Sequence, residues 1–272
     1  MWTINRILKV VFDLVYAVLG RLHPAVALVV ISGVFGVGAL LVIRYCSNQT
    51  AVGRIKDGIK ANLLAIKLYK DELRVTFGAL PRILWAAARL QGHMIPPLLV
   101  MIVPMILVCA QMATHHEWGP LPVGRRAVLT IGLHPDTPVA ATEVQPRLPA
   151  GVTLDHRVRS AAVNEISWYV QASQPGCYDL AFHIGDRDYG KELVVSDWPE
   201  RVSPLRHDGH LGESIMYPCE RPFAGDSAVE SISIAYPAMA SWFYGSTWWI
   251  VWFLILSIVI ALVFKPFLKV KL

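Results

Sequence analysis

The sequence predicts an α-helical membrane protein with three transmembrane helices, a cytoplasmic helical hairpin, and an inserted extracytoplasmic all-β domain of the immunoglobulin-like sandwich type. Three observations predict this class: long apolar runs without charge, charge that is sorted by segment, and short strand-like stretches separated by turn residues. Of the 272 residues, 54% are hydrophobic and only 17% are charged. This composition favours a bilayer protein over a soluble one of the same length.

Three apolar runs carry the membrane prediction, and they cover residues 25–43, 94–113 and 242–264. About 20 residues in a helix cross a hydrocarbon core of roughly 30 Å, so each run is long enough to span. Small residues in the first run permit close helix contact, and prolines in the second free carbonyls that neighbouring groups must cover. A packed or groove-forming bundle is therefore expected. These residues are Ser32, Gly33, Gly36 and Gly38, and Pro96, Pro97 and Pro104.

Charge is sorted between the segments that join the spans. Residues 44–93 hold nine Lys and Arg against three acids, whereas residues 114–241 hold sixteen Asp and Glu against ten basic residues. The tail 265–272 adds three lysines and no acid. The positive-inside rule therefore predicts a cytoplasmic hairpin and C-terminus, with the N-terminus and β domain outside, in a bacterial inner membrane.

Residues 1–24 are predicted to form an interfacial amphipathic helix on the outer face. Apolar residues recur at helical spacing from Ile4 to Leu22, but Asn5, Lys9 and Asp13 interrupt any continuous apolar region. A signal peptide needs such a region, whereas a helix lying in the membrane surface needs two different faces. The link Arg21–Pro24 then turns the chain into the first span.

Residues 44–93 are predicted to form an antiparallel helical hairpin. The first arm alternates apolar and basic residues from Thr50 to Tyr69, and the polar run Lys70–Glu72 makes the turn. The second arm begins near Leu73 and leads to Gly92, with Pro81 inside it. The charge of this hairpin suits the cytoplasmic side and could attract anionic lipid or ribosomal RNA.

Residues 114–241 are predicted to form the β domain. Short alternating or β-branched stretches are separated by Pro, Gly and Asp, as in a small sandwich. The stretch Asp197–Gly225 is a long loop rich in Pro, Gly and His, and loops of that length are usually functional or packed against another element. The expected strands are Arg126–Leu133, Val139–Val144, Glu165–Ala172, Cys177–Ile184, Lys191–Ser196 and Val229–Tyr236.

Candidate chemistry is sparse. Cys177 and Cys219 both fall in the outer domain, where a disulfide between them is a candidate. His207 and His210 lie in the long loop and are weak metal candidates, because surface histidines are usually solvated. No nucleophile-elbow, phosphate-loop, dinucleotide or zinc-hydrolase motif occurs. We therefore expect no enzyme activity, no cofactor and no bound metal.

The order of elements in residues 1–113 resembles the YidC/Oxa superfamily of membrane insertases, especially its reduced three-span members such as the third subunit of the endoplasmic-reticulum membrane complex. The resemblance rests on Val42–Gln49, the basic hairpin, and Ile95–Ile106. It implies a hydrophilic groove open to the cytoplasm, in which an Arg of the first span receives polar parts of a client. Arg44, Asn48 and Gln49 are the candidate groove residues. The outer β domain has no counterpart in the minimal members of that family.

Two hypotheses for function follow. The first is an insertase-like assembly factor that accepts membrane-protein segments in a polar groove between its spans. The alternative is a non-catalytic accessory subunit of a larger membrane complex, with the β domain as its docking surface; a ligand-binding outer sensor is a third and weaker reading. The expected partners are membrane lipid, client segments or neighbouring subunits, and the ribosome, but not DNA.

Overall fold

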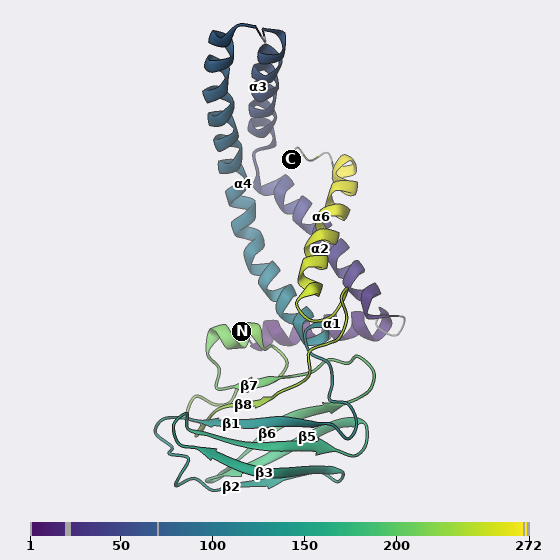
Figure 1. Cartoon of the computed structure of the whole chain (residues 1–272), viewed down its shortest axis with the longest axis vertical. Coiled ribbons are helices and arrows are strands. Elements are labelled where there is room, and N and C mark those ends of the chain that lie inside the picture. The colour runs from purple at the N-terminus through teal and green to yellow at the C-terminus, as the bar shows by residue number, and fades with distance from the viewer. Residues whose placement is uncertain (1, 20–22, 70, 269, 271–272) are drawn as a thin grey trace. The chain divides into compact units, whose positions relative to one another are not determined.

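The computed structural model describes residues 2–19, 23–69, 71–268 and 270, and these residues form six helices and eight strands (Figure 1). Their contacts divide the chain into two compact units. One unit comprises residues 1–28 and 106–252, and the other comprises residues 29–105 and 253–272. The predicted link Arg21–Pro24 and the lysines Lys269 and Lys271 lie wholly or partly outside the described residues.

Three helices are long and apolar enough to cross a membrane, as expected: α2 (Pro24–Cys46), α4 (Leu73–His116) and α6 (Trp248–Leu268). A shorter helix, α3 (Gln49–Leu68), precedes α4. The second hairpin arm, which was predicted to lead to Gly92, and the second span form one continuous helix. Helix α4 continues through Gly92 and its four prolines, and each proline leaves one carbonyl oxygen of the preceding turn without its helical hydrogen bond.

Helices α2 and α6 cross at very short range. A Cβ atom placed on Gly36 would lie 2.3 Å from the backbone oxygen of Ser257, and one on Gly33 would lie 3.3 Å from Ile260. The rings of Phe35 and Phe253 pack beside this crossing at 5.2 Å between centroids. Gly33 and Gly36 therefore permit close contact between α2 and α6, as expected for small residues. In contrast, only 11% of the most apolar window of α4 is buried, so its described residues do not form a closed bundle.

The β domain consists of two antiparallel sheets packed face to face (Figure 1). Alternating side chains of both sheets form one apolar core, and Trp168 stacks on Phe182 across the two sheets. The larger sheet has the order β3-β4-β1-β8-β7 and the smaller β2-β5-β6. The strands are β1 (Arg126–Leu133), β2 (Val144–Arg147), β3 (Val152–Ser160), β4 (Glu165–Ala172), β5 (Gly176–Ile184), β6 (Arg187–Val195), β7 (Leu205–His207) and β8 (Val229–Ile234).

One predicted strand does not form, and the strands β2, β3 and β7 were not predicted; β7 and α5 (Leu211–Met216) lie inside the predicted loop Asp197–Gly225. The predicted strand Val139–Val144 is wrong, because residues 139–141 form a turn, which the Asn164 side chain holds by accepting the Val139 N–H at 2.8 Å. Strand β3 was not predicted, because its edge position leaves most of its side chains exposed and polar. Beyond the strands, the helices α1 (Trp2–Leu19) and α5 complete this unit.

The crossing of α2 and α6 can be tested by two matched substitutions. Glycine to alanine normally stabilises a helix interior by about 0.5–1 kcal/mol. Gly38 has open space around its Cβ position, so Gly38→Ala should be neutral or stabilising. Gly36→Ala should instead destabilise by about 1–3 kcal/mol, because its methyl group meets the Ser257 backbone. Thermal unfolding of both variants in detergent measures the difference; equal melting temperatures would contradict the crossing.

Candidate functional site

Helix α1 attaches to the β-domain unit through one polar face. The Asn5 amide donates a hydrogen bond to the Ser214 carbonyl oxygen at 2.6 Å, and the Lys9 ammonium donates one to the Cys219 carbonyl oxygen at 3.3 Å. Asp13 lies 3.7 Å from the Arg201 guanidinium. Because these three residues are spaced four apart, they lie on the same side of the helix. Each contacts the chain between β6 and β8.

The next turn of α1 reaches a buried hydrogen-bond chain. The Tyr16 hydroxyl lies 2.7 Å from His116 Nε2, and His116 Nδ1 lies 2.6 Å from the Tyr244 carbonyl oxygen. A carbonyl oxygen only accepts, so we assign the proton to Nδ1; Nε2 then accepts the proton of the Tyr16 hydroxyl. Burial raises the pKa of Tyr16, which keeps the hydroxyl neutral and able to donate.

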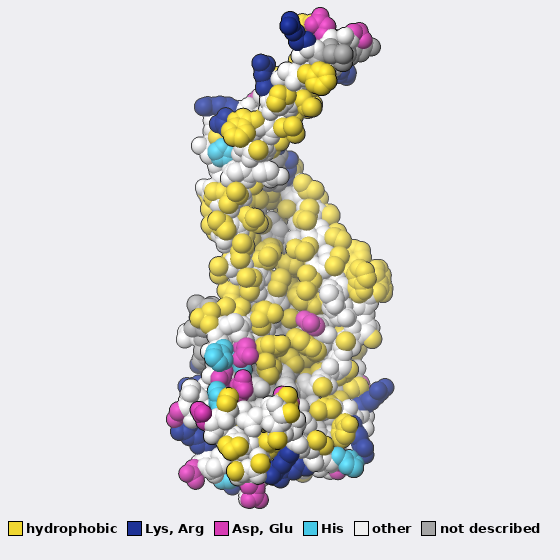
Figure 2. All heavy atoms as spheres, turned by 60° about the vertical axis from the view of Figure 1, so that its left-hand side comes forward, with side chains coloured by type: hydrophobic (Ala, Val, Ile, Leu, Met, Phe, Trp, Pro, Cys, Tyr) yellow, Lys and Arg dark blue, Asp and Glu magenta, His cyan; other side chains and the backbone are white. Residues whose placement is uncertain are grey.

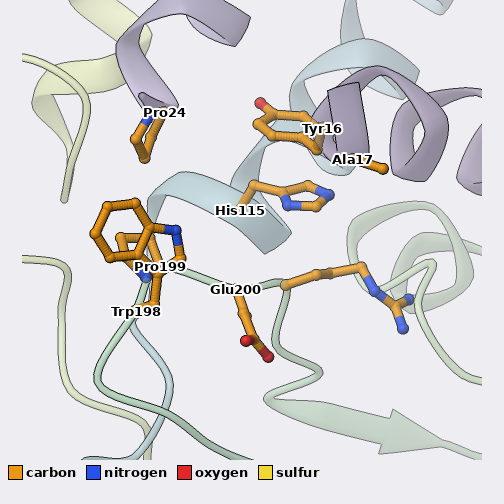
Figure 3. Close-up of a pocket in the computed structure, with 8 residues that line it drawn as sticks. Tyr16, Ala17, Pro24, His115, Trp198, Pro199 and Glu200 are labelled. Atoms are coloured by element: carbon orange, nitrogen blue, oxygen red, sulfur yellow. The ribbon is translucent and has the colours of Figure 1, made fainter. Parts of the chain in front are cut away.

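A pocket of about 350 Å³ lies beside the hydrogen bonds of Tyr16 and His116. It is lined by α1, the end of α4 and the segment after β6. Figure 3 shows the ring of Tyr16 lying over that of His115, and the two rings are parallel within 5° at a centroid distance of 3.7 Å. The guanidinium of Arg201 lies 3.5 Å from the Glu192 carboxylate. The pocket is thus bordered by stacked rings and by a salt-bridged arginine.

The opposite face of α1 is apolar and exposed, so the two faces of this helix meet different surroundings. Its apolar side chains follow helical spacing, and between half and two-thirds of each one's surface is accessible. The helix is therefore amphipathic, and its predicted place in a membrane surface stays a prediction. These side chains are Ile7, Val10, Val11, Leu14 and Val18.

A buried charge pair holds the long loop to the sandwich. Lys191, on β6, is 1% exposed and pairs with the carboxylate of Glu220. Its ammonium also donates to the backbone oxygen of Ser203 at 2.6 Å. Burial lowers the pKa of Lys191, and the Glu220 carboxylate opposes that change by favouring the charged ammonium. Both loop partners lie within the predicted loop Asp197–Gly225, which is therefore packed onto the β domain.

The candidate groove residues lie at the junction of α2 and α3. The Asn48 side chain accepts the Ala51 N–H at 3.0 Å and so caps α3, while the Gln49 amide donates to the Ile43 carbonyl oxygen at 3.1 Å. Arg44 is exposed, with its guanidinium 5.8 Å from the Tyr45 ring centroid. The contacts of Asn48 and Gln49 satisfy backbone groups at the start of α3 and the end of α2. A polar groove around Arg44, Asn48 and Gln49 stays a prediction.

A recess of about 270 Å³ lies between α2 and α6. Eight of its nine lining residues are apolar or glycine, and Ser257 is the polar one. None of the three candidate groove residues lines it. The recess can therefore accept apolar side chains of a protein or acyl chains of a lipid. The apolar members are Phe35, Gly36, Ala39, Leu40, Ile43, Ile258, Ala261 and Leu262.

The hairpin exposes large apolar side chains outside the uncharged run 94–113. Figure 2 shows apolar and basic side chains side by side on this part of the chain. On α3 and the first turns of α4, seven large apolar side chains are at least half exposed, up to 71% for Phe77. A soluble surface rarely leaves so many together. They are Leu63, Leu64, Leu68, Phe77, Leu80, Leu84 and Trp85.

The cysteines and loop histidines have distinct surroundings. Cys177 and Cys219 are free thiols here. Burial and the neighbouring Glu192 carboxylate raise the pKa of the Cys177 thiol to about 11, and burial also raises that of Cys219. The two cysteines are not bonded to each other in this structure, and the disulfide between them stays a prediction. His207 and His210 do come together, with two carboxylates that the sequence analysis had not singled out.

No protein-family model matches this sequence, and no curated protein matches it at a significant level. Sequence reasoning predicted the amphipathic helix α1 but not that its polar face contacts the β domain. The four-residue spacing of Asn5, Lys9 and Asp13 was its signal, because residues on one side of a helix share one neighbour.

The buried pair predicts a specific pattern of stability. Glu220→Gln leaves the Lys191 ammonium buried beside a neutral amide, so the free energy of unfolding should fall by about 3 kcal/mol. The double variant Lys191→Met with Glu220→Leu removes both charges and should recover most of that loss. Thermal unfolding of the full chain, followed by the β-sheet signal in circular dichroism, measures both. A double variant less stable than the single one would contradict this account.

Proposed function

We propose that this protein is a membrane-protein assembly factor of the insertase-like type. The observation that carries the proposal is the row of exposed apolar side chains on the hairpin, outside the uncharged span. Covering apolar surface is worth about 25 cal/mol for each Å² removed from water, so such a surface favours an apolar occupant. The occupant we propose is the hydrophobic segment of another membrane protein before its insertion.

Two further features support this function. Basic residues accompany the apolar ones on the hairpin, among them Lys60, Lys67 and Arg74, and they would draw this region toward anionic lipid headgroups. The recess between α2 and α6 is apolar and would accept side chains of a segment that enters the bilayer. The proposed role thus rests on binding apolar segments; a polar groove at Arg44, Asn48 and Gln49 would lower the barrier for polar ones.

The proposed topology follows from charge. The hairpin and the C-terminus would lie in the cytoplasm, and the N-terminal helix and the β domain would lie on the outer side of a bacterial inner membrane. The two-sheet architecture of eight strands supports an immunoglobulin-like type for that domain. The exposed apolar face of α1 suits the outer face of that inner membrane.

Photo-crosslinking tests the proposed function. A photoreactive phenylalanine analogue is placed at Leu64 or Trp85 on the hairpin, and at Val163 on the β domain as an equally exposed apolar control. During membrane-protein synthesis, Leu64 and Trp85 should give crosslinks to many different newly made membrane proteins, at least several-fold above Val163. One fixed partner in stoichiometric amount would support the accessory-subunit alternative instead. Absence of hairpin-specific protein crosslinks would contradict both.

Cysteine labelling tests the topology. Leu68→Cys lies on the hairpin and Val163→Cys on the turn between β3 and β4, and both side chains are more than half exposed. A membrane-impermeant maleimide added to intact spheroplasts should label position 163, whereas position 68 should react only after permeabilisation. Peptide mass spectrometry separates these sites from the native cysteines. Labelling of position 68 in intact spheroplasts would reverse the proposed orientation.

A further inference from the structure

Five side chains with metal-binding atoms gather where the long loop meets the end of β1. His207 ends β7, His210 precedes α5, and Glu213 lies in the first turn of α5. Asp208 lies at the centre: its Oδ2 atom is 3.3 Å from His134 Nε2 and 3.3 Å from His210 Nε2. His207 Nδ1 is 3.6 Å from a Glu213 oxygen.

Two atoms of this cluster are buried without a hydrogen-bond partner among the described residues. They are His207 Nε2 and Asp208 Oδ1. The two side chains are themselves deeply buried, at 1% exposure for His207 and 9% for Asp208. Buried nitrogen and oxygen atoms are nearly always paired with protein, water or an ion. The unpaired Asp208 Oδ1 therefore points to a bound donor or cation. His207 Nδ1 accepts the Gly209 N–H at 2.9 Å, so Nε2 carries the ring proton in this structure, and metal binding through His207 would break that hydrogen bond.

We propose that this cluster is a Zn²⁺ site. One ligand atom from each of His207, Asp208 and Glu213 already lies within 4.8 Å of the other two. Ligand atoms around a tetrahedral zinc ion are about 3.4 Å apart, so shifts on the order of 1 Å would complete the site. His210 and His134 both contact the Asp208 carboxylate and supply further imidazole nitrogens. Imidazole with carboxylate suits Zn²⁺, whereas Mg²⁺ and Ca²⁺ prefer oxygen alone.

The ion would join three segments of the β-domain unit. His134 follows β1, His207 ends an edge strand, and Glu213 belongs to α5. The next residue, Ser214, accepts the hydrogen bond from Asn5 of α1. A zinc ion here would therefore fix the loop on which the N-terminal helix rests, which is a structural role independent of the proposed client binding.

Metal binding by the full chain tests the site. The protein, purified in detergent with no histidine tag, is stripped with a chelator and titrated with Zn²⁺ in a calorimeter. The expected result is one Zn²⁺ per chain. His210→Ala and Glu213→Gln should each weaken binding at least 10-fold, because each removes one ligand. Both side chains are largely exposed, at 74% for His210 and 45% for Glu213, so the variants should still fold.

His183→Ala is the matched control, because it removes an imidazole that pairs with Asp188 at 2.7 Å elsewhere on the same domain. It should leave zinc affinity unchanged. Zn²⁺ should also raise the melting temperature of the unaltered chain and of this control, but not of the two site variants. No Zn²⁺ uptake, or equal affinity in the site variants and the control, would overturn the proposal.

Discussion

The two-sided packing of α1 is the constraint on which much of the β-domain unit depends. One face donates to the carbonyl oxygens of Ser214 and Cys219 and places Asp13 beside Arg201. The other face leaves apolar side chains exposed. A helix with these faces suits a boundary between a polar protein surface and an apolar medium, which is the arrangement proposed here for the membrane surface.

The polar face needs a rigid surface to rest on, and the long loop before β8 supplies it. Lys191 and Glu220 attach that loop from inside the domain, because a buried ammonium needs its carboxylate partner. Arg206 attaches it again, by donating to the Gly190 carbonyl oxygen at 2.5 Å and lying over the Phe223 ring. The proposed zinc site would add a third attachment at the end of β1. The loop is therefore an anchoring surface for α1.

The unit formed by residues 29–105 and 253–272 has few close helix contacts and many exposed apolar side chains. Its helices approach closely at Gly33 and Gly36, and much of their remaining described surface is uncovered apolar side chains. In lipid this has little consequence for the spans, because a hydrocarbon surround replaces protein contacts. On the hairpin the same exposure is unusual, and it is the reason for proposing an apolar client there.

Local sequence patterns predicted a large part of this fold. The limits of β1 and β4 were predicted to the residue, because both alternate buried and exposed positions between clear turn signals. The three apolar helices were predicted from length and lack of charge. The edge strand β3 was not predicted, because its exposed, polar side chains give no local signal and its pairing with β4 stabilises it.

Residue composition and spacing by themselves determined the apolar spans, the basic hairpin, the amphipathic N-terminal helix and the existence of a β domain. These depend on interactions with solvent or lipid that each segment has alone. Only the tertiary structure decided that Asp13 meets Arg201, and that His134 joins His207, Asp208 and Glu213. The first contact joins residues 188 positions apart, and the His134–Asp208 contact joins residues 74 positions apart. The physical reason is that a long-range contact depends on how strands pair and loops pack, which no local periodicity encodes.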